Sequence, residues 1–71
     1  MRRANLAAER ARRGWTLAEA AYHSGVSINT YLEWEKGTGS IRSQNLERLS
    51  ALYGCPIEYL LKQEDQTPVS K

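Results

Sequence analysis

Glycine spacing is the sequence feature that most constrains how this chain of 71 residues can fold. The glycines are Gly14, Gly25, Gly37, Gly39 and Gly54. Most intervals between them are about a dozen residues, the length of a short helix with its turn. Alanine and leucine are frequent in the chain and proline is scarce, which favours helices over strands. The sequence therefore predicts a single all-α domain.

The first two intervals carry helix start and stop signals. Residues 5–13 are rich in Ala and Arg, which are good helix formers, and Gly14 follows as a stop. A second helix is expected to begin with the sequence Thr-Leu-Ala-Glu at Thr16. This is a capping box, in which the Thr16 hydroxyl accepts from the Glu19 amide and the Glu19 carboxylate accepts from the Thr16 amide. Gly25 is expected to end this helix.

A third helix is expected at residues 27–36, between a serine N-cap and a glycine stop. On a helical wheel Tyr31 and Trp34 fall on one side, and Asn29 and Glu33 lie opposite. Large aromatic residues three apart most often mark a core face. We therefore expect Tyr31 and Trp34 to point inward, which leaves Asn29 and Glu33 exposed.

Two further helices complete the predicted domain. Leucines recur at helical spacing within residues 43–53, and Pro56 suits the first turn of a short fifth helix. We predict a helical domain at residues 1–62. The remaining residues, 63–71, form a polar C-terminal tail that we expect to fray.

Composition argues against several classes of function. Hydrophobic residues make up 41% of the chain and charged residues 25%, which are ordinary values for a globular protein. The one cysteine, Cys55, and the one histidine, His23, cannot make a disulfide, a metal site or a nucleophilic triad. We therefore predict no catalytic residue, no metal and no cofactor, and a binding protein rather than an enzyme.

No segment is apolar enough for a signal peptide or a membrane span, so we expect a cytoplasmic, nucleoid-associated protein.

Residues 16–37 fit a helix-turn-helix motif in both length and turn chemistry. Ala20, Ala21 and Val26 supply small contacts that allow the two helices to pack closely. Gly25 supplies a turn position at which a side chain would be strained. In such a motif the first helix fixes the angle of the second and leaves one side of it exposed.

Beyond the motif, the sequence resembles the lambda-repressor-like family of helix-turn-helix domains, the Cro/repressor or XRE type, over roughly residues 6–61. The resemblance is carried by Arg10, Gly14-Trp15-Thr16, Glu19-Ala20-Ala21, Gly25-Val26-Ser27, Thr30-Tyr31, Trp34-Glu35-Lys36-Gly37, Leu46, Leu49, Leu52, Gly54 and Ile57-Glu58-Tyr59-Leu60-Leu61. It implies a compact five-helix fold. It also implies a sequence-specific regulator of transcription that binds double-stranded DNA, and we expect a repressor.

The resemblance makes the helix at residues 27–36 the recognition helix, whose exposed side meets base edges in the major groove. The implied base contacts are Ser27, Ile28, Asn29, Thr30 and Glu33. Asn29 suits a bidentate contact to adenine, and Glu33 can accept from the amino group of cytosine. The alternative for Asn29 and Glu33 is a solvated helix face without a ligand.

Phosphate contacts are expected from amides at helix starts, from the loop after the recognition helix and from an N-terminal basic arm. The implied residues are Thr16, Leu17, Thr38, Ser40, Arg42, Arg2 and Arg3. For each arginine the alternative is a charge that only keeps the surface soluble. The family commonly has glutamine at the position of Leu17, so one side-chain contact to phosphate is expected to be missing.

The resemblance also predicts an ion pair between Arg10 in the first helix and Glu35 at the end of the third. We expect this pair to be at least partly buried and to hold the recognition helix in place. Glu9 stands where the family frequently has an apolar residue, which is a departure from the pattern.

Two rival functions can be compared with DNA binding. A protein-interaction module of the same fold, such as the antitoxin of a toxin–antitoxin pair, is suggested by the apolar residues Ile28 and Leu32 on the recognition side. An enzyme has no support from any catalytic motif.

One short helix contacts few base pairs, so we expect a homodimer, at least on DNA. Our expected dimer surface is the fifth helix with Tyr59 and Leu61, and the alternative is that these residues complete the core.

Overall fold

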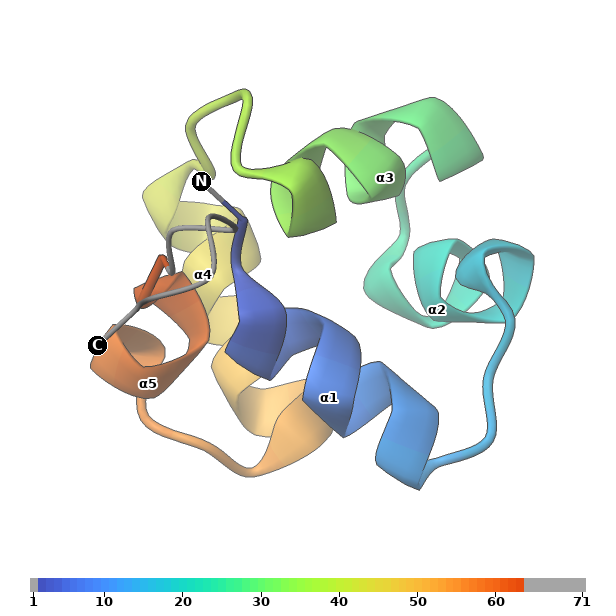
Figure 1. Cartoon of the computed structure of the whole chain (residues 1–71), viewed down its shortest axis with the longest axis horizontal. Coiled ribbons are helices and arrows are strands. Elements are labelled where there is room, and N and C mark those ends of the chain that lie inside the picture. Colours follow the sequence, from blue (N-terminus) through green and yellow to red (C-terminus); the bar gives the residue numbers. More distant parts are fainter. Residues whose placement is uncertain (1, 64–71) are drawn as a thin grey trace, which may run out of the picture.

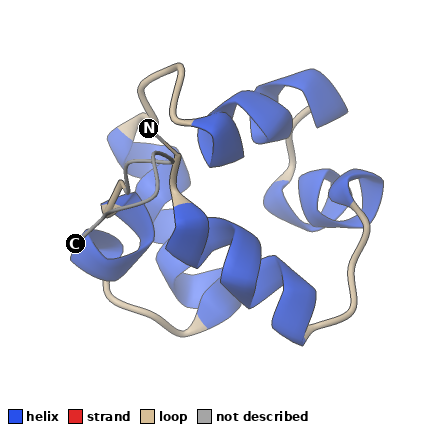
Figure 2. Ribbon diagram, in the orientation of Figure 1, coloured by secondary structure: helices blue, strands red, loops and turns tan. Residues whose placement is uncertain are grey.

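The computed structural model describes residues 2–63, and this part of the chain folds into helices. They are α1 (Ala4–Arg12), α2 (Leu17–Ser24), α3 (Ile28–Lys36), α4 (Ser43–Tyr53) and α5 (Ile57–Leu61). Figures 1 and 2 show α2 and α3 on one side of the molecule, and α1, α4 and α5 gathered on the other. The predicted all-α, five-helix fold is confirmed. Nearly all of the predicted tail lies outside the described residues.

Local capping signals determine where α2 and α3 begin. The Thr16 amide donates to Glu19 Oε1 at 2.8 Å, and the Glu19 amide donates to Thr16 Oγ1 at 3.1 Å. This confirms the predicted capping box. At the start of α3, the Thr30 amide donates to Ser27 Oγ at 3.2 Å. Side chains thus satisfy amides that the first turn of each helix leaves without a backbone partner.

The turn between α2 and α3 depends on Gly25, which adopts a left-handed conformation with φ of 76°. Its amide donates to the Tyr22 carbonyl, and the next amide, of Val26, donates to the Ala21 carbonyl. Arg48 of α4 adds a contact from outside, because its guanidinium donates to the Ser24 carbonyl at 3.1 Å. The turn is therefore held by its own backbone and by α4.

The core lies where all five helices meet. Its buried apolar residues are Leu6, Ala20, Ala21, Tyr31, Trp34, Ile41, Leu49, Tyr53 and Leu60. The two alanines are at most 1% exposed, and Leu17 at the start of the same helix also packs against the core, so α2 meets its neighbours through two small side chains and one leucine. None of the helices within residues 2–63 is long and apolar enough to cross a membrane.

Two buried tyrosines join α3 to α4. The hydroxyl groups of Tyr31 and Tyr53 lie 2.7 Å apart, and the rings are 0% and 3% exposed. Burial raises the pKa of both phenols, so both are neutral at physiological pH. The pair gives each buried hydroxyl a partner, and it fixes the inner face of α3.

A buried carboxylate joins α1 to α5. Glu9 is 6% exposed, and its Oε2 accepts from the Tyr59 hydroxyl at 2.9 Å. Its other oxygen accepts from Arg13 at 3.2 Å, and Arg13 also donates to the Tyr53 carbonyl at 3.0 Å. A polar network thus occupies a position where the family that the sequence resembles frequently has an apolar residue. Tyr59 is half-buried and belongs to this network.

Candidate nucleic-acid interface

The outer face of α3 is the surface that the fold leaves free within the helix-turn-helix. Tyr31 and Trp34 are buried, as the sequence predicted. Asn29 and Glu33 are exposed, and Ile28 is 49% exposed. The structure therefore presents one amide, one carboxylate and one aliphatic side chain on the face of α3 that points away from the core.

The remaining predicted base contacts lie at the start of the same helix. Ser27 is exposed and Thr30 is half-buried. The Ser27 hydroxyl donates to Thr30 Oγ1 at 3.0 Å and accepts from the Thr30 amide. Both hydroxyls therefore already take part in capping α3, and Asn29 is the better placed of the polar groups for a contact with an external ligand.

Glu33 lies beside the loop that follows α3. Its Oε1 would stand 3.8 Å from a Cβ atom placed on Gly39. The amides of Gly37 and Thr38 both donate to the Glu33 backbone carbonyl, at 3.0 and 3.2 Å. This side chain therefore faces the loop at residues 37–42 as well as the outer surface.

The loop at residues 37–42 presents the polar groups that were predicted to contact phosphate. Thr38, Ser40 and Arg42 are all exposed, and Ile41 between them is buried in the core. The side chain of Ile41 thus holds the loop against the domain while its neighbours face outward. Figure 1 shows this loop rising beyond the end of α3 before the chain enters α4.

At the start of α2, Thr16 is exposed and Leu17 is half-buried. The Thr16 amide is occupied by the carboxylate of Glu19, but the Thr16 hydroxyl, which accepts from the Glu19 amide, keeps its own proton to donate. Any phosphate contact by Thr16 therefore uses the hydroxyl and not the amide.

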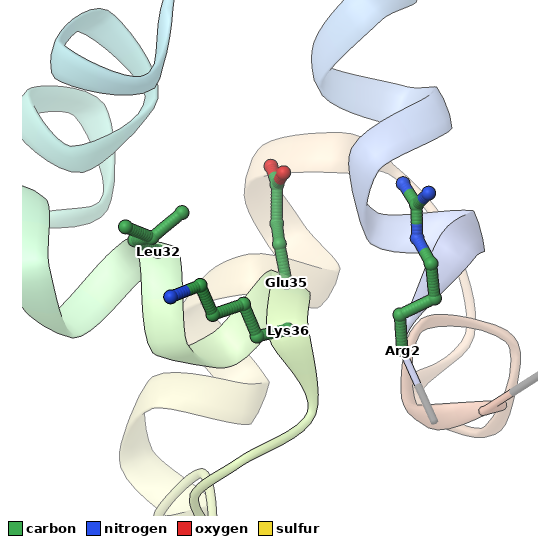
Figure 3. A pocket seen from close by; sticks show the side chains of 4 residues that line it. All are labelled: Arg2, Leu32, Glu35 and Lys36. Atoms are coloured by element: carbon green, nitrogen blue, oxygen red, sulfur yellow. The ribbon is translucent and has the colours of Figure 1, made fainter. Parts of the chain in front are cut away.

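Arg2 borders a pocket next to the end of α3. The pocket has a volume of about 240 Å³, and it is lined by Arg2, Leu32, Glu35 and Lys36. Figure 3 shows that Arg2 comes from the segment before α1, and that the other three side chains come from the last turns of α3. Arg2 and Lys36 are exposed, so both cations are available to a ligand at this edge of the interface.

Arg3 differs from the expected free arm. It is only 5% exposed, and its guanidinium donates to the carbonyls of Trp34 at 2.6 Å and Gly39 at 2.7 Å. Its amide donates to the Glu35 carbonyl at 2.9 Å. The Trp34 carbonyl lies in the last turn of α3 and also accepts from the Gly37 amide at 3.3 Å, and Arg3 adds a charged donor at this C-terminal end of the helix. We therefore leave Arg3 out of the phosphate contacts proposed below.

Arg10 and Glu35 lie in contact. Arg10 Nε donates to Glu35 Oε2 at 2.6 Å and Nη2 donates to Oε1 at 3.2 Å, so the pair is bidentate. The third donor, Nη1, reaches the Trp15 carbonyl at 3.0 Å. The hydrogen bond to Glu35 raises the pKa of Arg10, against the opposing effect of burial. Through this pair α1 holds the end of α3 and the segment before α2.

Sequence reasoning missed the roles of Arg3 and Glu9. Arg3 bonds residues 31 and 36 positions later, and Tyr59, one of the partners of Glu9, lies 50 positions later. The one available signal in the sequence was that Glu9 stands where the family frequently has an apolar residue. A buried carboxylate with Arg12 and Arg13 three and four positions later implies partners nearby.

This arrangement defines a helix-turn-helix domain with an exposed second helix. A family model described as helix-turn-helix matches residues 6–60. The chain belongs to this helix-turn-helix family, of the lambda-repressor-like, XRE type.

Two relatives show the same similarity. The cryptic phage CTXphi transcriptional repressor RstR of Vibrio cholerae is 43% identical over 47 residues, which cover 66% of this chain and 42% of that repressor. The chain thus matches less than half the length of this relative. The solution structure of the SOS-response transcriptional repressor LexA from Eubacterium rectale aligns with a TM-score of 0.73 at 25% identity, over 94% of this chain and 76% of that one.

Proposed function

We propose that this chain is a sequence-specific DNA-binding repressor of transcription that places α3 in the major groove. The observation that carries the proposal is the orientation of α3, whose aromatic residues Tyr31 and Trp34 are buried while Asn29 is exposed. An α-helix fits the major groove, where each base pair presents a distinct pattern of donors and acceptors. The similarity to two transcriptional repressors supports the regulatory role. The function proposed is binding and not catalysis.

Within this proposal Asn29 is the principal contact to a base, through a bidentate pair with adenine. Ile28 is exposed enough to meet the methyl group of thymine. Glu33 is the third candidate, and cytosine is the base that offers it a donor. Ser27 and Thr30 stand at the start of the same helix and complete the proposed surface.

We propose that Thr16 and Leu17 contact phosphates on one flank of the groove. The loop residues Thr38, Ser40 and Arg42 meet phosphates on the other flank, together with Arg2. These contacts orient α3 but carry no sequence information. They also make the affinity depend on salt, because each neutralised phosphate releases counterions.

The experiment that tests the proposal is selection of bound duplexes from random DNA at low salt, followed by titration of the winning sequence. We expect a defined sequence, with the logarithm of the binding constant falling linearly with the logarithm of salt at a slope of about −0.9 per phosphate contact. No duplex affinity at low salt would overturn the proposal. Capture of a protein by the Ile28 surface would then favour the antitoxin-like alternative.

A pair of variants separates base contacts from phosphate contacts. Asn29→Ala is expected to cost about 1–3 kcal/mol at the selected site and to relax preference at one base pair. Arg42→Ala is expected to weaken all sequences alike and to reduce the salt slope by about 1. Equal effects of both variants on all sequences would remove Asn29 from the set of base contacts.

A further inference from the structure

Arg3 is a buried cation whose partners are backbone carbonyls. The Trp34 carbonyl belongs to the last turn of α3, and the Gly39 carbonyl belongs to the loop at residues 37–42. The two hydrogen bonds leave from different guanidinium nitrogens, at 2.6 and 2.7 Å. Arg3 therefore bridges the recognition helix and the loop that follows it.

The chemistry of this bridge is specific to arginine. A guanidinium is planar and presents several N–H donors in a rigid fork, so that one side chain can serve two carbonyls held at a fixed angle. Lysine has the same charge, but its ammonium group sits at the end of a flexible chain and lacks this planar arrangement of donors. Hydrogen bonds from a charged donor are also stronger than neutral ones, and a cation at the end of a helix interacts favourably with its dipole.

The loop has few other attachments near Gly39. The amides of Gly37 and Thr38 are held by the Glu33 carbonyl, and Ile41 is buried. Between these points the Gly39 carbonyl has Arg3 as its partner, while Thr38 and Ser40 face outward. Without Arg3, the loop would be held only at its two ends, by the Glu33 carbonyl and by the buried side chain of Ile41.

We propose that Arg3 is a positioning residue for DNA binding, which fixes the loop at residues 37–42 relative to α3 so that phosphate contacts and base contacts fit one duplex together. The inference rests on the proposed function. It assigns Arg3 a role distinct from that of its neighbour Arg2, which is exposed and lines the pocket beside Lys36. Arg2 meets the ligand, whereas Arg3 acts through the loop.

Arg3→Lys tests this role because it keeps the charge and removes the fork. A residue that touched phosphate directly would tolerate lysine, since an ammonium binds phosphate as a point charge. A bridge between two carbonyls would not. We expect Arg3→Lys and Arg3→Gln to weaken binding to the selected duplex by a similar factor, of about tenfold, which is the scale of one lost charged hydrogen bond. A lysine variant that binds as tightly as the unmodified chain would overturn the proposal.

A double-mutant cycle supplies the second readout. If Arg3 acts through the loop, Arg3→Gln and Arg42→Ala will have effects on affinity that combine less than additively. The matched control is Arg2→Gln, which removes the same charge one residue away, and its effect should add to that of Arg42→Ala. Full additivity of Arg3→Gln with Arg42→Ala would contradict the proposal.

Hydrogen exchange in the absence of DNA separates this inference from the proposed function. In Arg3→Lys the amides of Gly37 and Thr38, which donate to the Glu33 carbonyl, should exchange faster, while those in the middle of α4 keep their rates, which also shows that the variant is folded. Unchanged exchange in the loop would refute the bridge whatever the affinity. If the unmodified chain binds no duplex, the proposed function fails and the role of Arg3 in it fails as well, even where the loop loosens as expected.

Discussion

Arg10 and Glu35 show how individual side chains determine the placement of α3. Arg10 uses all three of its nitrogens, two toward Glu35 and one toward the Trp15 carbonyl. The side chains are 23% and 9% exposed, so the pair is shielded from solvent mainly on the side of the glutamate. Desolvation opposes the attraction in such a pair, but removing one partner alone leaves a buried charge without compensation.

Arg10→Met is therefore expected to destabilise the domain by about 3 kcal/mol, at the lower end of the range for a broken buried pair because Arg10 is partly exposed. For a domain of this size that corresponds to a fall in Tm of about 12 °C or more. Thermal unfolding followed by circular dichroism measures it. Arg12→Met is the control, because Arg12 is 70% exposed in its 3.4 Å contact with Glu9 and its loss should matter little. Equal Tm values for Arg10→Met and the unmodified chain would contradict the role of the pair.

Glu9 makes stability depend on pH. Burial raises the pKa of this carboxyl, but the hydrogen bonds from Tyr59 and Arg13 and the charges of Arg12 and Arg13 outweigh it, so the net pKa lies below the ordinary value of 4.5. A carboxyl with a depressed pKa in the folded state stabilises that state above the unfolded pKa. This contribution is lost as the pH falls below 4.5 and through the folded pKa.

Comparison of the unmodified chain with Glu9→Gln from pH 7 to pH 3 tests this linkage. At neutral pH the unmodified chain should have the higher Tm, and the difference should shrink as the medium becomes more acidic than about pH 4.5, because protonation removes the charge that the variant already lacks. In a Tyr59→Phe background, Glu9→Gln should lower the Tm at neutral pH by less, since one of the hydrogen bonds to Glu9 is already absent. Two melting curves that fall in parallel with pH would show that Glu9 is not the group responsible.

Helices α2 and α3 owe their boundaries to contacts between near neighbours in the chain. The capping box spans three residues, and the cap of α3 also links residues three apart. Short-range patterns of this kind can be recognised in a sequence, and so the starts of both helices were predicted correctly. The bridge from Arg3 joins residues more than thirty positions apart. No local pattern encodes it, because it exists only once α1 has packed against the end of α3.

The same distinction applies to the candidate interface. The inward orientation of Tyr31 and Trp34 follows from helical periodicity, which is local, and the exposure of Asn29 follows from theirs. The burial of Arg3 was missed because a basic residue at the start of a chain is usually solvated. The predicted contacts to bases and phosphates remain predictions for the DNA-binding experiments.

Thr16→Ala removes the side-chain half of the capping box and leaves the rest of α2 intact. We expect a loss of about 1 kcal/mol, which shifts Tm by about 4–8 °C in a domain of this size. Chemical denaturation measures the free energy directly. Thr38→Ala serves as the control, since Thr38 is exposed in a loop and caps no helix. Comparable losses in the two variants would mean that the capping box adds nothing to stability.

At the scale of the whole molecule, size limits how much DNA one copy can contact. The longest dimension is 38 Å and the other two are near 21 Å. One turn of B-DNA is about 34 Å long, so a single copy is about as long as one turn. We propose that two copies bind together on DNA, each at its own half-site. The contact through α5 stays a prediction, because Tyr59 and Leu61 both pack against the core of their own chain and Tyr59 donates to Glu9.

Half-site spacing provides the test of pairing. Two copies related by two-fold symmetry require half-sites about 10 base pairs apart, or a multiple of that. Insertion of about half a turn between the half-sites should abolish cooperative binding, while insertion of a full turn should restore part of it. Gel-shift titration of these duplexes shows both the stoichiometry and the cooperativity. Identical binding at every spacing would indicate that copies act singly.

The hydroxyl pair between Tyr31 and Tyr53 has a consequence for how this domain can diverge. The two buried hydroxyl oxygens lie 2.7 Å apart, and each serves as a hydrogen-bond partner of the other. A change of Tyr31 to phenylalanine leaves the buried Tyr53 oxygen short of a partner, and a change of Tyr53 leaves the Tyr31 oxygen with Glu35 alone, whereas phenylalanine at both sites removes both phenol oxygens. Descendants of this sequence should therefore keep both oxygens or lose both, and a lineage that passes through the single replacement does so at reduced stability.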